Sequence, residues 1–263
     1  MSFREREIDA NLKLTNPTIE LMRAHRSVRS YSPQPVTDEV VEAIIEAAQW
    51  APSSSFRQVC SVVGVRDIEK KRILRTLCNN QRWVEECPVF LVFCADLNRL
   101  DDLCQVEGLH TSMEYLETLV MTVLDVGIFI QNAALAAESL GLGTCMIGGL
   151  RDHSREVIQL LDLPQGVFGV SGLCLGYPAE VPKQRPRLPL AEVLYWERYD
   201  ATGRMERLAA YDQTIREAGI YPRKDGGSTG WTRIMRRRTS QPPLEGDRMK
   251  LREILEEQGF GLK

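Results

Sequence analysis

The sequence lacks a strong excess of charge of either sign. Its 263 residues carry a formal net charge of only -3 at pH 7, so no global positive field exists to attract nucleic acid or an anionic membrane. Hydrophobic residues make up 43% of the chain and charged residues 26%, which is typical of a folded globular protein and argues against disorder. We therefore expect a globular protein that acts on small molecules.

The sequence also lacks long hydrophobic runs and paired cysteines. Nowhere do 18 uncharged apolar residues follow one another, and the first 20 residues are charged where a signal peptide would be apolar. The seven cysteines form no C-x-x-C motif, and most lie inside apolar runs, as buried thiols do in a reducing compartment. We therefore predict a cytoplasmic protein with neither a membrane nor a nucleic acid as its partner.

Several common catalytic motifs are absent. Gly141-Leu142-Gly143 is followed by Met146 at the position where a G-x-G-x-x-G dinucleotide turn requires its third glycine. The sequence contains no G-x-x-x-x-G-K-[ST] loop and no G-x-S-x-G nucleophile turn. The histidines lie too far apart in the sequence for a local metal motif: His25, His110 and His153. These absences disfavour a P-loop nucleotidase, an acyl-transfer hydrolase and a zinc enzyme, and we expect no metal.

Hydrophobic periodicity predicts helices that alternate with short buried strands. Thr37 is a suitable N-cap, and apolar residues recur behind it at the helical spacing as far as Ala48. Short apolar or β-branched runs, bounded by proline, glycine or charge, predict strands at residues 59–65, 89–95 and 167–175. Further helices are predicted at about 17–25 and 248–258.

The segment from about residue 117 to 140 predicts a helix of a different kind. Apolar residues occupy nearly all of its faces between Val126 and Leu135, and Gly141 is placed to end it. Such a helix belongs in the middle of a protein or of a dimer.

The chain is expected to form one domain, because it contains no internal repeat and no low-complexity linker. Residues 1–14 are polar and are predicted to form a flexible N-terminal extension, and residues 15–263 form the single domain. After Leu188 the chain becomes charged and is predicted to be irregular, with residues 226–230 in a loop. Residues from about 190 to 263 would therefore form a C-terminal arm.

Two basic clusters are candidate phosphate ligands. The first, His25-Arg26-Ser27-Val28-Arg29, places two guanidinium groups, a hydroxyl and an imidazole within five residues. Charge-assisted hydrogen bonds of this kind contribute about 1.5–3 kcal/mol each. The second cluster contains Arg185 and Arg187, and nearby prolines restrict its backbone. Either cluster could instead be a solvated surface loop, but arginines in two rigid contexts favour a phosphate site assembled from distant segments.

Three other segments could line a flat ligand. The pair Gly148-Gly149 allows close approach of a ligand to the backbone and leaves N–H groups free to donate, although a simple turn would have the same sequence. Gln81 offers an amide that can meet both a donor and an acceptor. One loop combines hydroxyls with an aromatic ring, or is an ordinary Ser/Thr turn: Ser53, Ser54, Ser55 and Phe56.

Taken together, these segments resemble the nitroreductase superfamily, in its branch of oxygen-insensitive NADPH nitroreductases and flavin reductases. The resemblance covers about residues 15–263 and is specific, because many segments match in one order. They are residues 25–29, 53–56, 92–96, 131–133, 136–143, 147–151, 173–176 and 186–189.

The resemblance implies an α+β fold, or three-layer α/β fold, of the nitroreductase type that binds FMN. A central mixed sheet would be flanked by helices, and the C-terminal arm would wrap around the partner subunit of a homodimer.

The resemblance also implies roles for the candidate residues. A basic cluster would surround the FMN phosphate and the adjoining polar edge: His25, Arg26, Ser27, Arg29, Arg185 and Arg187. The ribityl chain and ring would be lined from the other subunit by Ser53, Ser54, Ser55 and Phe56, while Gln81 would face the pyrimidine. The N–H groups near flavin N5 and O4 would come from the end of the segment Met146, Ile147, Gly148 and Gly149.

The sequence departs from the family pattern in three places. Met146 replaces an aromatic residue that is frequent at its position, and residues 1–14 have no counterpart. Arg223 resembles the arm arginine that binds NADPH, but a second basic position shortly after it is glycine or serine here.

The activity implied is that of an FMN-dependent NAD(P)H oxidoreductase with ping-pong kinetics. NADPH, or NADH, would reduce the flavin, and a nitroaromatic, a quinone or free flavin would then accept two electrons. Such chemistry needs no side-chain nucleophile, which agrees with the absent motifs. A reductive dehalogenase on the same fold and a flavin-binding or scaffold protein without NAD(P)H turnover are the alternatives.

Overall fold

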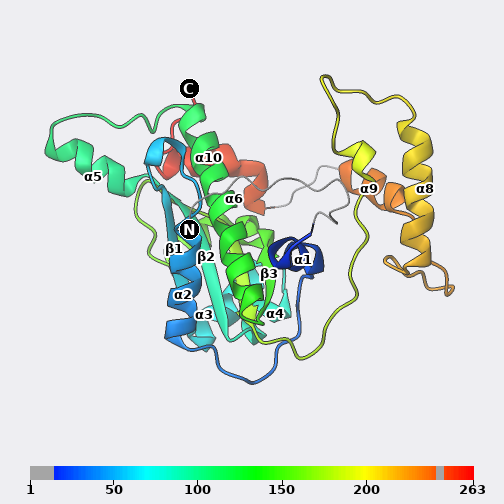
Figure 1. The fold of residues 1–263 in the computed structure, drawn as a ribbon. Helices are drawn as coiled ribbons and strands as arrows, with labels where there is room; N and C mark the ends of the chain where they lie inside the picture. The colour runs from blue at the N-terminus through cyan, green and yellow to red at the C-terminus, as the bar shows by residue number, and fades with distance from the viewer. Residues whose placement is uncertain (1–14, 241–245) are drawn as a thin grey trace.

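The computed structural model describes residues 15–240 and 246–263, so the extension predicted at residues 1–14 lies outside the described residues. Four strands form one sheet between two layers of helices, and an arm extends from one side of this body (Figure 1). The predicted α+β, three-layer architecture is therefore confirmed.

The strand order across the sheet is β1 (Cys60–Val65), β2 (Val89–Asp96), β4 (Val167–Gly176) and β3 (Gly143–Ile147). Three strands coincide with the predicted runs to within one residue, whereas β3 was not predicted. All pairings between these strands are antiparallel, which corrects the expectation of a mixed sheet. Among the described residues, parallel pairing is limited to an isolated bridge between Ser27 and Thr144. Apolar patterns predict that a segment is a strand, but its direction depends on the path of the whole chain.

Strand β2 is buried on both faces and separates two hydrophobic layers. One layer contains α2 (Asp38–Ala48), α6 (Leu116–Ser139) and α10 (Leu251–Glu257), and the other contains α3 (Ile68–Leu77), α4 (Arg82–Glu86) and α7 (Ser154–Leu160). Because side chains alternate along a strand, successive residues of β2 enter the two layers in turn. Leu91 and Phe93 pack in the first layer, and Phe90 and Val92 in the second.

Helix α6 is the apolar helix that the sequence predicted, and it ends before Gly141, whose φ is +81°. Within the described residues it is the one helix that is long and apolar enough to cross a membrane by length and composition. It packs against the sheet and α2, however, and buries Asp125 near its middle, so it serves here as a core helix.

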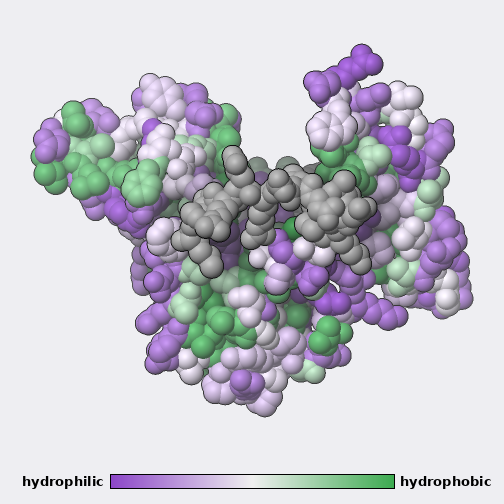
Figure 2. Space-filling view, viewed as in Figure 1, coloured by the Kyte–Doolittle hydropathy of each residue, from purple (hydrophilic) through white to green (hydrophobic). Residues whose placement is uncertain are grey.

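One side of α6 carries apolar side chains that the rest of the chain leaves exposed. These exposed side chains recur at intervals of one helical turn, at Leu116, Val120, Val123 and Leu124. The exposed Gly127 continues the row, and a Cβ atom added there would meet no atom within 4 Å. We call these five residues the α6 stripe. Figure 2 shows further hydrophobic surface on α5 (Asn98–Val106), which projects from the body and exposes Leu103 and Val106.

The arm contains two helices, α8 (Arg204–Glu217) and α9 (Trp231–Thr239), which stand apart from the body (Figure 1). They pack against each other through Tyr211 and Trp231, whose ring centroids lie 5.9 Å apart, and through Asp212, which accepts the N–H of Thr232 at 2.8 Å. The prediction that this region is irregular is therefore wrong. Helix α8 buries only Tyr211 and Ile215, so its sequence needs few apolar residues and shows little of the periodicity that predicts a helix.

The chain then returns to the body at η4 (Gly246–Lys250), a 3₁₀ helix that leads into α10. Helix α10 begins at Leu251, three residues after the start predicted for the C-terminal helix.

The sheet core leaves no space for a side chain at Gly172 of β4. A Cβ atom there would lie 2.3 Å from Cζ of the buried Phe90, so Gly172→Ala must displace an aromatic ring. We expect a loss of about 1–3 kcal/mol and a fall of about 2–10 °C in the midpoint of thermal unfolding. Calorimetry at fixed protein concentration would measure it. Gly64→Ala in β1 is the matched control, because its Cβ would lie at an ordinary 3.6 Å from Leu91. Equal midpoints for the two variants would contradict this account of the core.

Candidate functional site

The two basic clusters, which lie far apart in the sequence, meet at one pocket of about 360 Å³. The first cluster follows α1 (Pro17–Ala24), the second follows β4, and the residues after α8 close the pocket. Six candidate phosphate ligands line it together: His25, Arg26, Ser27, Arg29, Arg185 and Arg187. We call this cavity the basic pocket.

The first cluster is held in place by the edge of the sheet. Val28 donates its N–H to Thr144 O of β3 at 2.8 Å, and its buried side chain packs against Gly143, where a Cβ atom would lie only 2.6 Å from it. Since side chains of an extended segment alternate, Ser27 and Arg29 are directed away from this contact. The sheet therefore fixes which side chains of the cluster face the pocket.

His25 is anchored by the end of α6. Its Nδ1 lies 2.7 Å from Glu138 Oε1, and Thr144 Oγ1 donates to the same oxygen at 2.9 Å. The carboxylate of Glu138 is thus bound by both His25 and Thr144.

The arginines of the pocket keep their charge available. Arg26 and Arg29 donate to the backbone oxygens of Ala24 and Ser27, at 2.8 and 3.2 Å. Within residues 15–240 and 246–263, neither of these arginines nor Arg185 or Arg187 has a carboxylate within ion-pair distance. The pocket therefore offers the cations that an anion of high charge, such as a phosphate, requires.

Trp83 of α4 was not recognised from the sequence. The guanidinium of Arg29 lies 5.4 Å from the centroid of its ring, which is a cation–π distance, and its Nε1 is buried without a hydrogen-bond partner in the described part of the chain. Trp83 thus restricts where the Arg29 side chain can lie.

The glycine pair begins the 3₁₀ helix η2 (Gly148–His153), directly after β3. The amide of Gln81 lies so close to Gly149 that a Cβ atom there would be 2.7 Å from Gln81 Nε2. The structure thus brings together Gln81 and the glycine turn, 68 residues apart in the sequence. Of the two residues before the glycines, Met146 is partly exposed, whereas the Ile147 side chain is buried in the core and can offer only its backbone to a ligand.

A second group at this turn was missed by sequence reasoning. Arg248 donates from Nη2 to Gly148 O at 2.6 Å and forms an ion pair with Asp152, which also accepts from Asn79 Nδ2. Burial, together with the nearby Arg248, lowers the pKa of Arg151, which still remains a cation at neutral pH. No local pattern marks Arg248, because its contact spans 100 residues.

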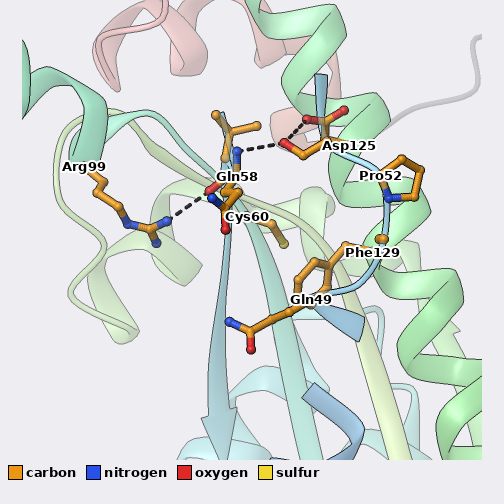
Figure 3. A pocket seen from close by; sticks show the side chains of 10 residues that line it. Gln49, Pro52, Gln58, Cys60, Arg99, Asp125 and Phe129 are labelled. Atoms are coloured by element: carbon orange, nitrogen blue, oxygen red, sulfur yellow. Dashed lines mark hydrogen bonds between the residues drawn. The ribbon is translucent and has the colours of Figure 1, made fainter. Parts of the chain in front are cut away.

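The loop that contains Ser53 and Ser54 is bound to Asp125 of α6, away from the end of the helix that holds His25 (Figure 3). Asp125 accepts from Ser53 Oγ at 3.1 Å, from Ser54 N at 2.9 Å and from Ser54 Oγ at 2.7 Å. Ser53 Oγ in turn accepts the N–H of Gln58 at 2.7 Å, and Gln58 O accepts from Arg99 at 3.0 Å. A small pocket of about 100 Å³ is bordered by Ser53, Gln58, Arg99 and Asp125.

The remaining residues of this loop project outward. Ser55 and Phe56 adopt positive φ angles of 52° and 57°, and Phe56 is 80% exposed. Asp125 and Glu138, which anchor the loop and His25, are separated by 13 residues of α6, or about 20 Å. One chain therefore does not bring the serine loop to the basic pocket.

Arg223 lies on the arm, in a tight turn closed by backbone hydrogen bonds between Arg223 and Gly227 and between Thr229 and Tyr221. It forms an ion pair with Asp225, and the hydrogen bond from Arg223 lowers the pKa of that carboxyl to about 2. Arg223 borders a cavity of about 560 Å³, here called the arm pocket, together with two more arginines, Arg233 and Arg237. The other residues that line it are Asp225, Thr229 and Ile234.

Comparison with known proteins identifies relatives over nearly the whole chain. The model of the "Nitroreductase family" matches residues 22–177, and that of the "Nitroreductase family, C-terminal domain" matches residues 185–263.

Individual relatives agree with these matches. The chain is 39% identical over 254 residues to the FMN reductase [NAD(P)H] of Bacillus subtilis (93% of this chain, 98% of that protein). It is 37% identical over 248 residues to the oxygen-insensitive NADPH nitroreductase of Salmonella typhimurium (94% of this chain, all of that protein). The structure of NfrA2 from B. megaterium is similar with a TM-score of 0.88 and 37% identity, covering 95% of this chain and all of that one.

Proposed function

This chain belongs to the nitroreductase family, and from that premise we propose that it is an FMN-dependent NAD(P)H oxidoreductase that reduces small electron acceptors. The observation that carries the proposal is the basic pocket, in which arginines from two distant clusters face one cavity and have no ion-pair partner among the described residues. The acceptor would be a nitroaromatic, a quinone or free flavin.

The donor set fits FMN. Arginines and a serine hydroxyl suit the phosphate, and Gln81 beside Gly149 offers an amide together with backbone N–H groups to a flat, polar ring edge. When bound, FMN supplies the redox chemistry by taking up a hydride from NAD(P)H and passing two electrons to the acceptor. In this proposal the basic pocket would hold the phosphate, Gln81 and Gly149 would orient the ring, and Arg29 would supply a fixed cation to offset negative charge on the reduced flavin.

We further propose that the active unit is a homodimer. The α6 stripe and the arm both need more cover than one chain provides, and the serine loop lies about 20 Å from the His25 anchor along α6. A second subunit would bring its Ser53, Ser54, Ser55 and Phe56 to the flavin of the first. We also propose a cytoplasmic location, which the seven free cysteines support.

The direct test of the function is anaerobic mixing of the purified, FMN-loaded protein with NADPH. We expect about one FMN per subunit and rapid loss of flavin absorbance near 450 nm, followed by reoxidation when a quinone or nitroaromatic is added. Protein that takes up no FMN would refute the proposal. Bound FMN that NADPH and NADH leave oxidised would identify a flavin-binding protein without turnover, and halide release from a halogenated substrate would identify the dehalogenase.

Arg29 should contribute directly to FMN binding. Arg29→Ala removes a cation of the basic pocket, and we expect FMN to bind about tenfold to a hundredfold more weakly, as for the loss of one charge-assisted hydrogen bond. Fluorescence titration of the apoprotein would measure the dissociation constant. Arg72→Ala is the control, because Arg72 lies on the exposed face of α3 and pairs with Glu69. Equal constants for the two variants would place Arg29 outside the cofactor site.

The α6 stripe should form part of the subunit interface. Leu124→Asp would put a carboxylate into an apolar contact, so we expect sedimentation at micromolar concentration to show a shift from dimer to monomer. Ile73→Asp on α3 makes the same chemical change at a similarly exposed position and should leave the dimer intact. A wild-type protein that is monomeric and fully active would remove the basis of the dimer proposal.

The arm pocket should favour NADPH over NADH. We propose that Arg223 binds the 2′-phosphate and that Arg233 and Arg237, one turn apart on α9, supply the second cation that the sequence lacks just after Arg223. Arg223→Ala and Arg237→Ala should each lower kcat/KM about tenfold to a hundredfold for NADPH and little for NADH.

The exposed Arg252, which pairs with Glu256 on α10, provides the control substitution Arg252→Ala. Steady-state kinetics would measure kcat/KM of each variant with NADPH and with NADH. Equal losses with NADPH and NADH would mean that the arm cations act on the site in general, and a wild-type preference for NADH would reject the assignment.

A further inference from the structure

Three consecutive residues of η4, Gly246-Asp247-Arg248, hold the segment that contains the glycine turn. We call them the C-terminal clasp. Gly246 has a φ of +66° and lies so near the backbone of Asp152 that a Cβ atom would be 2.7 Å from Asp152 O. Asp247 accepts the N–H of Arg155 at 3.0 Å. Each residue of the clasp thus contacts the segment from residue 148 to 155.

Arg248 makes the contact that reaches the turn itself. Its Nη2 donates to Gly148 O at 2.6 Å, while its Nε forms an ion pair with Asp152 that lacks the geometry of a hydrogen bond. Asp152 is nearly buried, and its second carboxylate oxygen accepts from Asn79. Asn79 and Asn80 both have positive φ angles, of 58° and 55°, in the loop that leads to Gln81. One carboxylate therefore ties together the clasp, the Gln81 loop and the glycine turn.

The hydrogen bond to Gly148 O also determines where the next N–H points. A peptide unit is planar and trans, so its C=O and N–H point in opposite directions. When Arg248 holds the carbonyl of Gly148, the N–H of Gly149 is directed to the other side of the turn. Because Gly149 lies in the first turn of η2, this N–H has no acceptor within that helix. Outside this helix too, no backbone hydrogen bond of the described residues is donated by Gly149, so this N–H can donate to a ligand.

We propose that Asp152 and Arg248 are positioning residues for the flavin ring, because together they fix the Gly149 N–H and the Gln81 amide in one orientation. This inference rests on the proposed function. Neither residue belongs to the basic pocket, so the clasp should act on the isoalloxazine ring and leave the phosphate unaffected. That separation gives the proposal its test.

The test compares FMN with riboflavin, which has the same ring but no phosphate. Apoproteins carrying Arg248→Ala or Asp152→Asn would be titrated with each flavin, and binding would be followed by flavin fluorescence. We expect both substitutions to weaken FMN and riboflavin by the same factor, about three- to tenfold, as for the loss of one backbone hydrogen bond. Since the two residues act as one unit, the double variant should bind no more weakly than the weaker single variant.

Two controls separate the ring from the rest of the site. Arg187→Ala in the basic pocket should weaken FMN but leave riboflavin unchanged. Glu253→Gln removes an ion pair with Arg155 close to the clasp without touching the turn, and should leave both flavins unchanged. Asp152→Asn keeps the size of the side chain and therefore tests the clasp even if Arg248→Ala fails to fold.

Two results would overturn the proposal. Unchanged affinity for both flavins in Asp152→Asn would show that the clasp merely stabilises the fold, and a loss confined to FMN would assign Arg248 to the phosphate side. Failure of the proposed function would look different, because the wild-type apoprotein would then bind neither flavin, or its bound FMN would stay oxidised with NADPH and NADH.

Discussion

Two carboxylates of one core helix, α6, hold the separate parts of the candidate site. Asp125 near the middle of α6 accepts three hydrogen bonds from Ser53 and Ser54, and Glu138 near its end holds His25. The helix itself is fixed by its packing against the sheet and α2. Since a buried carboxylate without partners is costly, each contact stabilises the fold as well as placing a loop. The α6 helix therefore sets the spacing between the basic pocket and the serine loop.

Local charge in this protein is unrelated to its net charge. The whole chain is slightly acidic, yet four arginines border the basic pocket and three border the arm pocket. Beside the basic pocket, Glu138 is engaged by His25 and Thr144, whereas in the arm pocket Asp225 pairs with Arg223 and leaves Arg233 and Arg237 as further cations. Because charges interact strongly only at short range in salt, it is this local arrangement that determines which anions bind.

The parts of the fold that the sequence predicted are those with strong local patterns. The helices α2 and α6 and the strands β1, β2 and β4 have clear apolar periodicity or apolar runs with defined ends. Strand β3 escaped prediction because it is only five residues long and merges into the glycine turn. The arm helices have few buried residues, so their largely polar sequence lacks the apolar periodicity from which a helix is predicted. The sheet direction could not be predicted, because it depends on how distant strands meet.

The sequence by itself determined the chemistry available at the site: two arginine clusters, a glycine pair, a serine loop and an amide at Gln81. Only the tertiary structure decided which of these groups meet. It joined the arginine clusters in one pocket, set Gln81 against Gly149, kept the serines at a distance and brought Arg248 to Gly148. The physical reason is that residue types and short-range spacing are local properties, whereas contacts across 100 residues exist only after the whole core has packed.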